Sequence, residues 1–224
     1  VGSFDKVLAS CKQIGERYQP TATQLSITAM SELLQRSHQA MKAVTTTQSA
    51  SRLAIIARRE TFAGLPTLSM RVVRMLATLD LSPDTLEAVN SLKQQLQGGR
   101  PAKKTSAEGS EGSTDVKRAA IRRHFGAQLQ TFGDLVQIIA DIGNYNPKET
   151  DLKLSALKAK VADLQSKSHA VVETKAALQN ARKLQKQLLY GTNGVTQTIK
   201  GAKNYVCSVF GVKSPELSEM TKRN

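Results

Sequence analysis

The chain is poor in aromatic residues, cysteine and long apolar runs. It has no Trp, only 4% aromatic residues and two cysteines, which are too few for a disulfide framework. No run approaches the 18 consecutive apolar residues of a membrane-spanning helix. No charged segment with a following apolar run opens the chain, so no signal peptide is predicted. The sequence therefore predicts a cytoplasmic protein without a membrane span, although a start at Val1 rather than Met leaves open a leader removed before it.

Residue patterns that support catalysis or bind a metal are equally scarce. The histidines, His38, His124 and His169, belong to no pattern that would place metal ligands on one helical face. Carboxylates stand mostly isolated among basic residues, and neither cysteine has a neighbouring His. The segment Gly191–Gly194 lacks the preceding strand and the following Lys-Ser/Thr of a phosphate-binding loop, which predicts a plain turn. We therefore expect no catalytic residue, no metal, no cofactor and no small-molecule substrate.

What the chain does contain favours helices. Apolar residues make up 40% of it, which suffices for a core, and Leu, Ala, Val, Lys and Gln dominate. No segment sustains the alternation of apolar and polar residues that a half-buried strand shows. The composition and the pattern together predict an all-α fold.

The sequence repeats itself at an offset of about 127 residues. The segment Ile14–Pro20 recurs as Ile142–Pro147, and Ser82-Pro83 recurs, after a small insertion, as Ser214-Pro215. Between these segments similar residues stay in step: Leu25 with Leu152, Ile27 with Leu154, Ala29 with Ala156, Met30 with Leu157, Leu34 with Val161, Val44 with Val171 and Ala50 with Ala177. Such self-similarity predicts two tandem duplicated helical units.

We divide the chain into a first helical repeat unit (residues 1–97), a basic linker rich in Gly and Ser that leads into the next helix (98–124) and a second helical repeat unit (125–224). From Gly98 to Ser113 no apolar residue is larger than Ala, which predicts a flexible segment. In each unit a short helix ends at a glycine, Gly15 or Gly143. A long helix, a third helix and a Ser-Pro helix start follow.

The long helices are predicted over about Thr21–Thr61 and Lys148–Tyr190, because neither stretch contains Gly or Pro. The segment Thr45–Ser49 leaves a kink open, since β-branched and polar residues lower helix propensity, but the uninterrupted second copy favours a continuous helix. Spacings of three and four predict a packing seam in each helix. Its members are Ile27, Met30, Leu34, Ser37, Met41, Val44, Gln48 and Ser51, and then Leu154, Leu157, Val161, Leu164, Ser168, Val171, Lys175 and Leu178.

Each long helix is about twice as long as the short helices beside it, so we predict that the two pack antiparallel in a pseudo-twofold helical bundle. The first helix of each unit then meets the third helix of the other, which places Cys11 and Cys207 in the same layer. The arrangement also brings the levels of His38 and His169 together. Two interpretations of that pair stay open: polar groups at a hydrated seam, or a pH-sensitive contact.

The second unit carries two specific motifs. The run Lys203–Pro215, which reads Tyr-Val-x-Ser-x-Phe-Gly-x-x-Ser-Pro from its third residue, resembles a C-terminal motif of small duplicated helical proteins from Bacteroidota. So does the Tyr-x-Pro turn Tyr145–Pro147 followed by Leu152–Leu157. The resemblance extends over nearly the whole chain, whereas in the first unit Arg74–Leu81 replaces the Tyr-Val and Phe-Gly pattern. That family has no established activity, so the resemblance implies an architecture and no site.

The net charge of +14 and the isoelectric point near 10.0 favour weak attraction to nucleic acid, anionic lipid or acidic proteins. The excess is +4 in residues 1–97, +4 in 98–124 and +6 in 125–224. No helix pairs a basic face with the large apolar face that binding to a lipid surface needs. The densest basic positions, which could contact a polyanion, are Arg58, Arg59, Arg71, Arg74, Lys103, Lys104, Lys117, Arg118, Arg122 and Arg123.

These observations predict a non-enzymatic structural or scaffolding protein that acts through helix-mediated self-association or the binding of a protein partner. The alternative is a nucleic-acid-binding protein without sequence specificity, which would use the spread basic charge. No helix-turn-helix, zinc finger or aromatic platform accompanies that charge. An enzyme comes third, because no set of residues supplies a nucleophile, a base or a metal.

Overall fold

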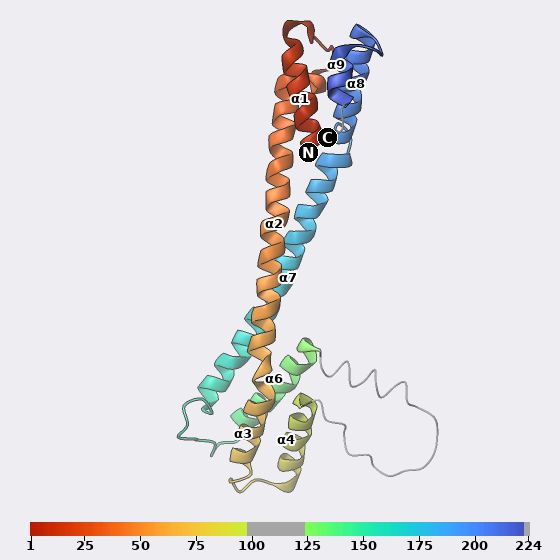
Figure 1. The fold of residues 1–224 in the computed structure, drawn as a ribbon. Coiled ribbons are helices and arrows are strands. Elements are labelled where there is room, and N and C mark those ends of the chain that lie inside the picture. The colour runs from red at the N-terminus through yellow and green to blue at the C-terminus, as the bar shows by residue number, and fades with distance from the viewer. Residues whose placement is uncertain (98–123, 222–224) are drawn as a thin grey trace, which may run out of the picture. The chain divides into compact units, whose positions relative to one another are not determined.

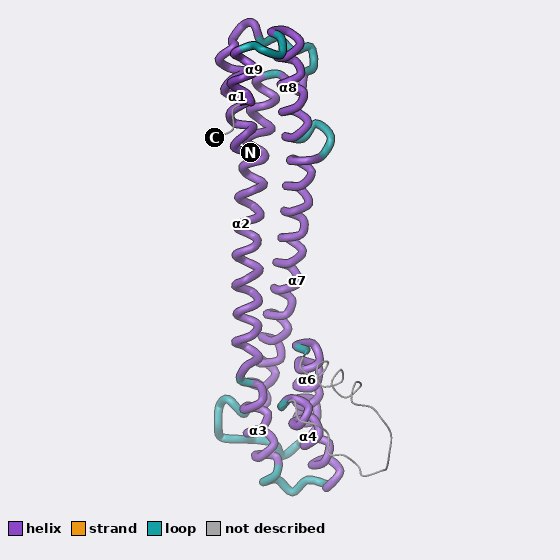
Figure 2. Tube along the Cα trace, turned by 45° about the vertical axis from the view of Figure 1, so that its right-hand side comes forward, coloured by secondary structure: helices purple, strands orange, loops and turns teal. Residues whose placement is uncertain are grey.

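The computed structural model describes residues 1–97 and 124–221 of the chain. Every regular element in these residues is a helix, and no strand occurs in them (Figures 1 and 2). The all-α prediction is confirmed. The segment 98–123, which holds the predicted linker up to its last residue, lies outside the described residues. The predicted polyanion-binding residues Lys103, Lys104, Lys117, Arg118, Arg122 and Arg123 lie there too.

The chain forms two compact units, and each draws on both halves of the sequence. Unit 1 consists of residues 1–51 and 174–224, and unit 2 of residues 52–173. The two long helices, α2 (Ile27–Ala63) and α7 (Leu154–Tyr190), each contribute residues to both units.

Unit 1 surrounds the short helix α1 (Gly2–Ile14). This helix contacts α8 (Val195–Phe210) and α9 (Pro215–Thr221), which come from the far end of the sequence (Figure 1). The start of α2 and the end of α7 join the same apolar cluster. The predicted contact between the first short helix and the third helix of the second repeat unit is therefore present, as the contact of α1 with α8. These two helices are more than 180 residues apart in the sequence. The buried cluster comprises Phe4, Val7, Leu8, Cys11, Ile14, Tyr18, Met30, Leu33, Val195, Ala202, Val206 and Met220.

The sequence of α1 explains both its buried face and its end. Phe4, Val7, Cys11 and Ile14 recur at spacings of three and four, so they line one side of a helix, and all four are buried. The helix ends at Gly15, whose φ of 63° belongs to the left-handed region that glycine adopts without steric cost. The 3₁₀ turn η1 (Gly15–Arg17) follows and carries the chain away from α1.

Unit 2 has the second apolar cluster. Helix α4 (Pro83–Leu96) contacts both α3 (Leu65–Leu76) and α6 (Phe125–Asp141), and the start of α7 and the end of α2 share their core. The sequence predicted a meeting of α3 and α6, and their buried side chains do belong to one cluster. The helix in contact with both is α4. The cluster comprises Phe62, Leu65, Val72, Val73, Leu76, Val89, Leu96, Phe132, Leu135, Val136, Ile139, Leu152, Leu157 and Leu164.

The long helices start later than predicted. Helix α2 begins at Ile27, because Ser26 has extended backbone angles and its Oγ accepts a hydrogen bond from the Ala29 amide at 3.2 Å, as a helix cap does. The short 3₁₀ turn η2 (Thr23–Leu25) occupies the residues before it. Helix α7 begins correspondingly at Leu154.

The Thr-rich middle of α2 stays helical. Thr45 and Thr46 donate their side-chain hydroxyls to the carbonyls of Met41 and Lys42, four residues earlier, at 3.2 and 3.0 Å. This local bonding satisfies the hydroxyls without leaving the helix. The helix is continuous from Ile27 to Ala63, as the second copy indicated.

Most predicted seam positions face the interior of the unit that holds them. Ser37 and Ser51 on α2 are buried, as are the three residues that form the buried set of α7, Leu157, Leu164 and Val171. Two predicted positions are exposed instead. The side chain of Met41 is 41% exposed, and Lys175 lies at the surface, where its charge stays solvated. The spacing of three and four therefore identifies most of the seam, and it fails at one apolar side chain, Met41, and one charged side chain, Lys175.

Candidate polyanion-binding surface

The predicted basic positions of unit 2 are only partly free. Arg58 lies on α2, and its guanidinium stacks over the ring of Phe125 at 4.2 Å from the ring centre. Its Nε is buried and has no hydrogen-bond partner within the described residues. The interaction of a cation with an aromatic face holds this side chain against the core of its own unit.

Arg71, on α3, forms an ion pair with Asp151, in the turn before α7. The hydrogen bond from the Arg71 guanidinium lowers the pKa of the Asp151 carboxyl, and the same bond raises the pKa of Arg71. The positive charge of Arg71 is therefore already balanced by the carboxylate of Asp151. Arg59 and Arg74 are exposed, so of the four described positions these two keep a solvated charge.

The structure concentrates basic charge in unit 1 instead. That unit carries 14 Lys/Arg and 5 Asp/Glu, an excess of +9, whereas unit 2 carries 18 and 13, an excess of +5. Since unit 1 is also the smaller of the two, its charge density is the higher. The grouping is not visible along the sequence, because unit 1 combines residues 1–51 with residues 174–224.

Seven of these cations lie in a segment without any acidic residue. From Glu173 to Glu216 the intervening chain has no Asp or Glu. The segment covers the unit 1 part of α7, all of α8 and the loop to α9. Six of its cations are exposed and Lys203 is half-buried, and none forms an ion pair with a described residue. They are Lys175, Arg182, Lys183, Lys186, Lys200, Lys203 and Lys213.

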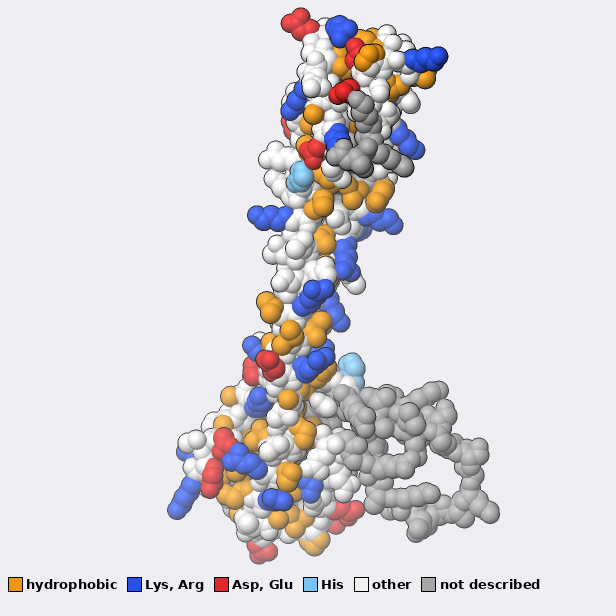
Figure 3. Space-filling model, viewed as in Figure 1, with side chains coloured by type: hydrophobic (Ala, Val, Ile, Leu, Met, Phe, Trp, Pro, Cys, Tyr) orange, Lys and Arg blue, Asp and Glu red, His pale blue; other side chains and the backbone are white. Residues whose placement is uncertain are grey.

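Three of the seven share one side of α7, and we call them the basic stripe: Lys175, Arg182 and Lys186. At about 100° per residue they fall within an arc of about 40°, and the rise along the helix axis from Lys175 to Lys186 is about 16 Å. Lys183 lies beside the stripe. Lys and Arg side chains follow the α7 side of unit 1 in Figure 3. A row of solvated cations without neutralising carboxylates attracts a polyanion through its phosphates.

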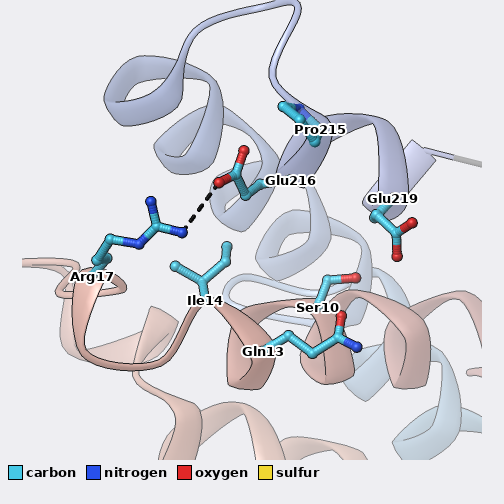
Figure 4. A pocket seen from close by; sticks show the side chains of 7 residues that line it. All are labelled: Ser10, Gln13, Ile14, Arg17, Pro215, Glu216 and Glu219. Atoms are coloured by element: carbon cyan, nitrogen blue, oxygen red, sulfur yellow. Dashed lines mark hydrogen bonds and ion pairs between the residues drawn. The ribbon is translucent and has the colours of Figure 1, made fainter.

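A pocket of about 320 Å³ lies where α1 and the turn after it meet α9 (Figure 4). Its charged groups are mixed in sign, because Arg17, Glu216 and Glu219 all line it. The Arg17 guanidinium is 3.3 Å from Oε1 of Glu216 and lies over the ring of Phe210 at 5.1 Å. Arg17, in the turn after α1, therefore contacts both α9 and the end of α8. The remaining lining residues are Ser10, Gln13, Ile14 and Pro215.

The tyrosines of the two Tyr-x-Pro turns make the same contact. The hydroxyl of Tyr18 donates to the carbonyl of Leu25 at 3.0 Å, and that of Tyr145 donates to the carbonyl of Leu152 at 2.8 Å. Burial raises the pKa of both hydroxyls, so they remain donors at neutral pH. Tyr205 packs edge-on against Tyr18, and its hydroxyl accepts a hydrogen bond from the Gln19 amide. These three rings serve the fold.

The two central histidines lie in different compact units. In unit 1, Nε2 of His38 is 3.7 Å from Oδ2 of Asp5. In unit 2, Nδ1 of His169 is 3.5 Å from Oε1 of Glu173, one helical turn away. Each is an exposed surface pair with a carboxylate of its own unit. Within the described residues no group of three or more His, Cys, Asp or Glu side chains could hold a metal ion.

Both cysteines belong to unit 1, in agreement with the predicted common layer, and both are free thiols. They differ in their exposure to solvent. Cys11 is fully buried, and burial raises the pKa of its thiol more than the hydrogen bond with Tyr18 lowers it. Cys207 is half-buried. The thiolate is the reactive form of a cysteine. Cys11 is therefore protected from modification both by the side chains that bury it and by the raised pKa that keeps its thiol protonated.

We therefore expect Ellman's reagent to modify one thiol per native chain quickly and the second only after denaturation. A Cys207→Ser variant should lose the fast phase, and a Cys11→Ser variant should keep it. Equal fast labelling of both thiols in the native protein would show that α1 is not packed as described.

No protein-family model matches this chain, and neither a curated protein nor a solved structure is significantly similar to it. Among the described helices, none is long and apolar enough to cross a membrane. The assignment of a function therefore depends on the residues themselves.

Sequence reasoning missed the basic stripe although its signal was available. The gap between Glu173 and Glu216 can be read directly from the sequence. Adjacent basic pairs such as Arg58 and Arg59 project from different sides of a helix, so the local density of charge does not indicate a basic face. Spacings of seven and four residues, as in the stripe, place charges on the same side.

Proposed function

We propose that this is a non-enzymatic structural protein that acts through helix-mediated association with itself or with a protein partner. The observation that carries the proposal is the exposure of large apolar side chains on the two long helices. Unit 1 exposes Met41 and Leu184, and unit 2 exposes Leu53, Ile56 and Val172. Apolar side chains that recur at the surface of long helices supply the contact area that helix association uses.

Leu53 and Ile56 carry this argument furthest. Their side chains are 64% and 49% exposed. They are three residues apart, so they form one surface patch, and the helical period places Leu53 about 160° to 180° from the buried Ser51 and Phe62. The patch therefore faces away from the core of unit 2 and has no role in its packing.

The association is tested by light scattering after size-exclusion chromatography over a range of protein concentrations. We expect a mass above the 24.3 kDa of one chain, and a Leu53→Glu, Ile56→Glu variant should return to that monomer mass. The matched control places the same two charges at exposed polar positions of α2, Gln35→Glu and Gln39→Glu, and should not change the mass. If the wild-type protein is monomeric at every concentration, self-association is excluded as its function.

We also propose that the chain is a tandem duplication with antiparallel long helices around a pseudo-twofold axis. Several matching features support it. Helices α2 and α7 both have 37 residues and start 127 positions apart. Ser82 and Ser214 each accept a hydrogen bond from an amide three residues later, and each precedes a proline. The two Tyr-x-Pro turns share a hydrogen bond as well. The resemblance to duplicated helical proteins from Bacteroidota agrees with this proposal.

A second candidate function is nucleic-acid binding without sequence specificity. The acid-free segment between Glu173 and Glu216 favours it, because phosphate contacts need only solvated cations. The affinity should fall steeply with salt between about 50 and 200 mM. An absence of binding at the low end of that range would eliminate this candidate.

A further inference from the structure

Among the residues that the structure describes, one aromatic side chain has no packing contact, and it lies at the end of the basic stripe. Tyr190 is the last residue of α7, and its side chain is 69% exposed. The other three tyrosines and all five phenylalanines are buried or hold a ring or hydrogen-bond contact in the described residues. Tyr190 has no such partner there. It follows Lys186 by four residues, so its ring lies next to the stripe on the same side of the helix.

We propose that this face of α7 binds single-stranded nucleic acid, with phosphates on Lys175, Arg182 and Lys186 and one base stacked on the ring of Tyr190. The inference rests on the second candidate function and specifies its site and its ligand. Proteins that bind single strands without sequence preference combine a row of cations with an exposed aromatic ring. In a duplex the bases are stacked on each other, so a surface ring has no base face to contact.

The electrostatics of unit 1 favour a polyanion at this place. None of the five acidic residues of unit 1 lies on α7 or α8. Asp5 stands beside His38, and Glu216 is paired with Arg17. Glu16, Glu32 and Glu219 lie on η1, α2 and α9. The unit 1 part of α7 and all of α8 therefore carry no carboxylate that competes with a phosphate, and Glu173, two residues before Lys175, lies about 160° around the helix from it and is 3.5 Å from His169.

The same face does not suit a lipid surface. Binding at a membrane interface needs an apolar face next to the cations. Apart from the ring of Tyr190, the large apolar side chain exposed on the unit 1 part of α7 is Leu184, at 52% exposure. At about 100° per residue it lies roughly opposite the stripe, so one flat surface cannot contact both. Gln179, which lies beside the stripe, adds a polar side chain.

The test measures fluorescence polarisation of a labelled oligothymidylate and of a labelled duplex with the full chain. The wild-type protein should bind the single strand more tightly than the duplex. A Tyr190→Ala variant should bind the single strand about 5- to 150-fold more weakly, which is the range for losing one stacked base, and should leave duplex binding unchanged. Tyr190→Phe should keep the wild-type affinity, because it keeps the ring.

The stripe is tested with Lys175→Gln, Arg182→Gln and Lys186→Gln together. For a single strand, the loss of three phosphate contacts should make the slope of log affinity against log salt shallower by about 2. The matched control removes three exposed cations of unit 2, Arg59→Gln, Arg74→Gln and Lys158→Gln, and should keep the wild-type slope. Helical circular dichroism should be unchanged in both variants, since Gln is a good helix former.

The outcomes separate the two proposals. If the wild-type chain binds no nucleic acid at low salt, both the second candidate function and this site are wrong. If it binds but both triple variants weaken it equally, the binding is diffuse and the site is wrong. Tighter binding to the duplex, or no effect of Tyr190→Ala, overturns the single-strand assignment. Preferential binding to phosphatidylserine vesicles overturns the choice of ligand.

Discussion

Neither residues 1–97 nor residues 125–224 should fold into a stable structure when produced alone. Each apolar cluster takes side chains from both segments. The cluster of unit 1 joins Phe4 and Met30 to Val206, and that of unit 2 joins Phe62 to Phe132 and Leu164. A segment produced alone would expose to water the side chains that it contributes to each cluster. Its helices would be marginally stable without tertiary packing.

Circular dichroism and thermal unfolding of the separate segments measure this. We expect each segment to have low helicity and no cooperative transition, and an equimolar mixture to recover both. The two segments give a direct control, because they are compared with their own mixture at the same total concentration. A cooperative transition in either segment alone would show that the halves are independent domains.

Replacing Phe132 by Ala should lower the free energy of unfolding by about 3 to 5 kcal/mol. The ring is fully buried in the cluster of unit 2, so its removal loses apolar burial and leaves a cavity. The control is Val212→Ala, which truncates a side chain that is 77% exposed in the turn before α9 and should change the free energy by less than about 0.5 kcal/mol.

Urea unfolding followed by circular dichroism gives both values. Comparison of the midpoints is meaningful only if the slope of the transition is unchanged, so the slope is reported for each variant. A change of less than about 1 kcal/mol for Phe132→Ala, the typical effect of any substitution, would contradict the described core.

The helices were predictable because their signals are local. The spacing of Phe4, Val7, Cys11 and Ile14 and the stop at Gly15 fix α1 without any knowledge of its neighbours. Most seam positions of α2 and α7 followed from the same spacing. The late start of α2 was missed, since the extended backbone of Ser26 depends on a hydrogen-bonded cap that its sequence only permits.

Long-range partners account for what the sequence did not show. In the sequence Arg58 and Arg71 resemble free surface charges. In the structure Arg58 contacts Phe125, 67 positions away, and Arg71 contacts Asp151, 80 positions away. The role of α4 as the helix in contact with both α3 and α6 was missed for the same reason. Tyr190 shows the converse: its sequence context is that of an ordinary helix end, and only its exposure distinguishes it from the other tyrosines.

The division into a continuous and a discontinuous unit has a consequence for the order of folding during synthesis. Unit 2 is one uninterrupted segment, residues 52–173, so all of its parts are available once residue 173 has left the ribosome. Unit 1 must wait for residues 174–224 before its opening helix finds a partner. At about 5 to 20 residues per second, α1 emerges on the order of ten seconds or more before α8. Prior folding of unit 2 would replace a long random loop by a folded body and so lower the entropy cost of joining the two ends of the chain.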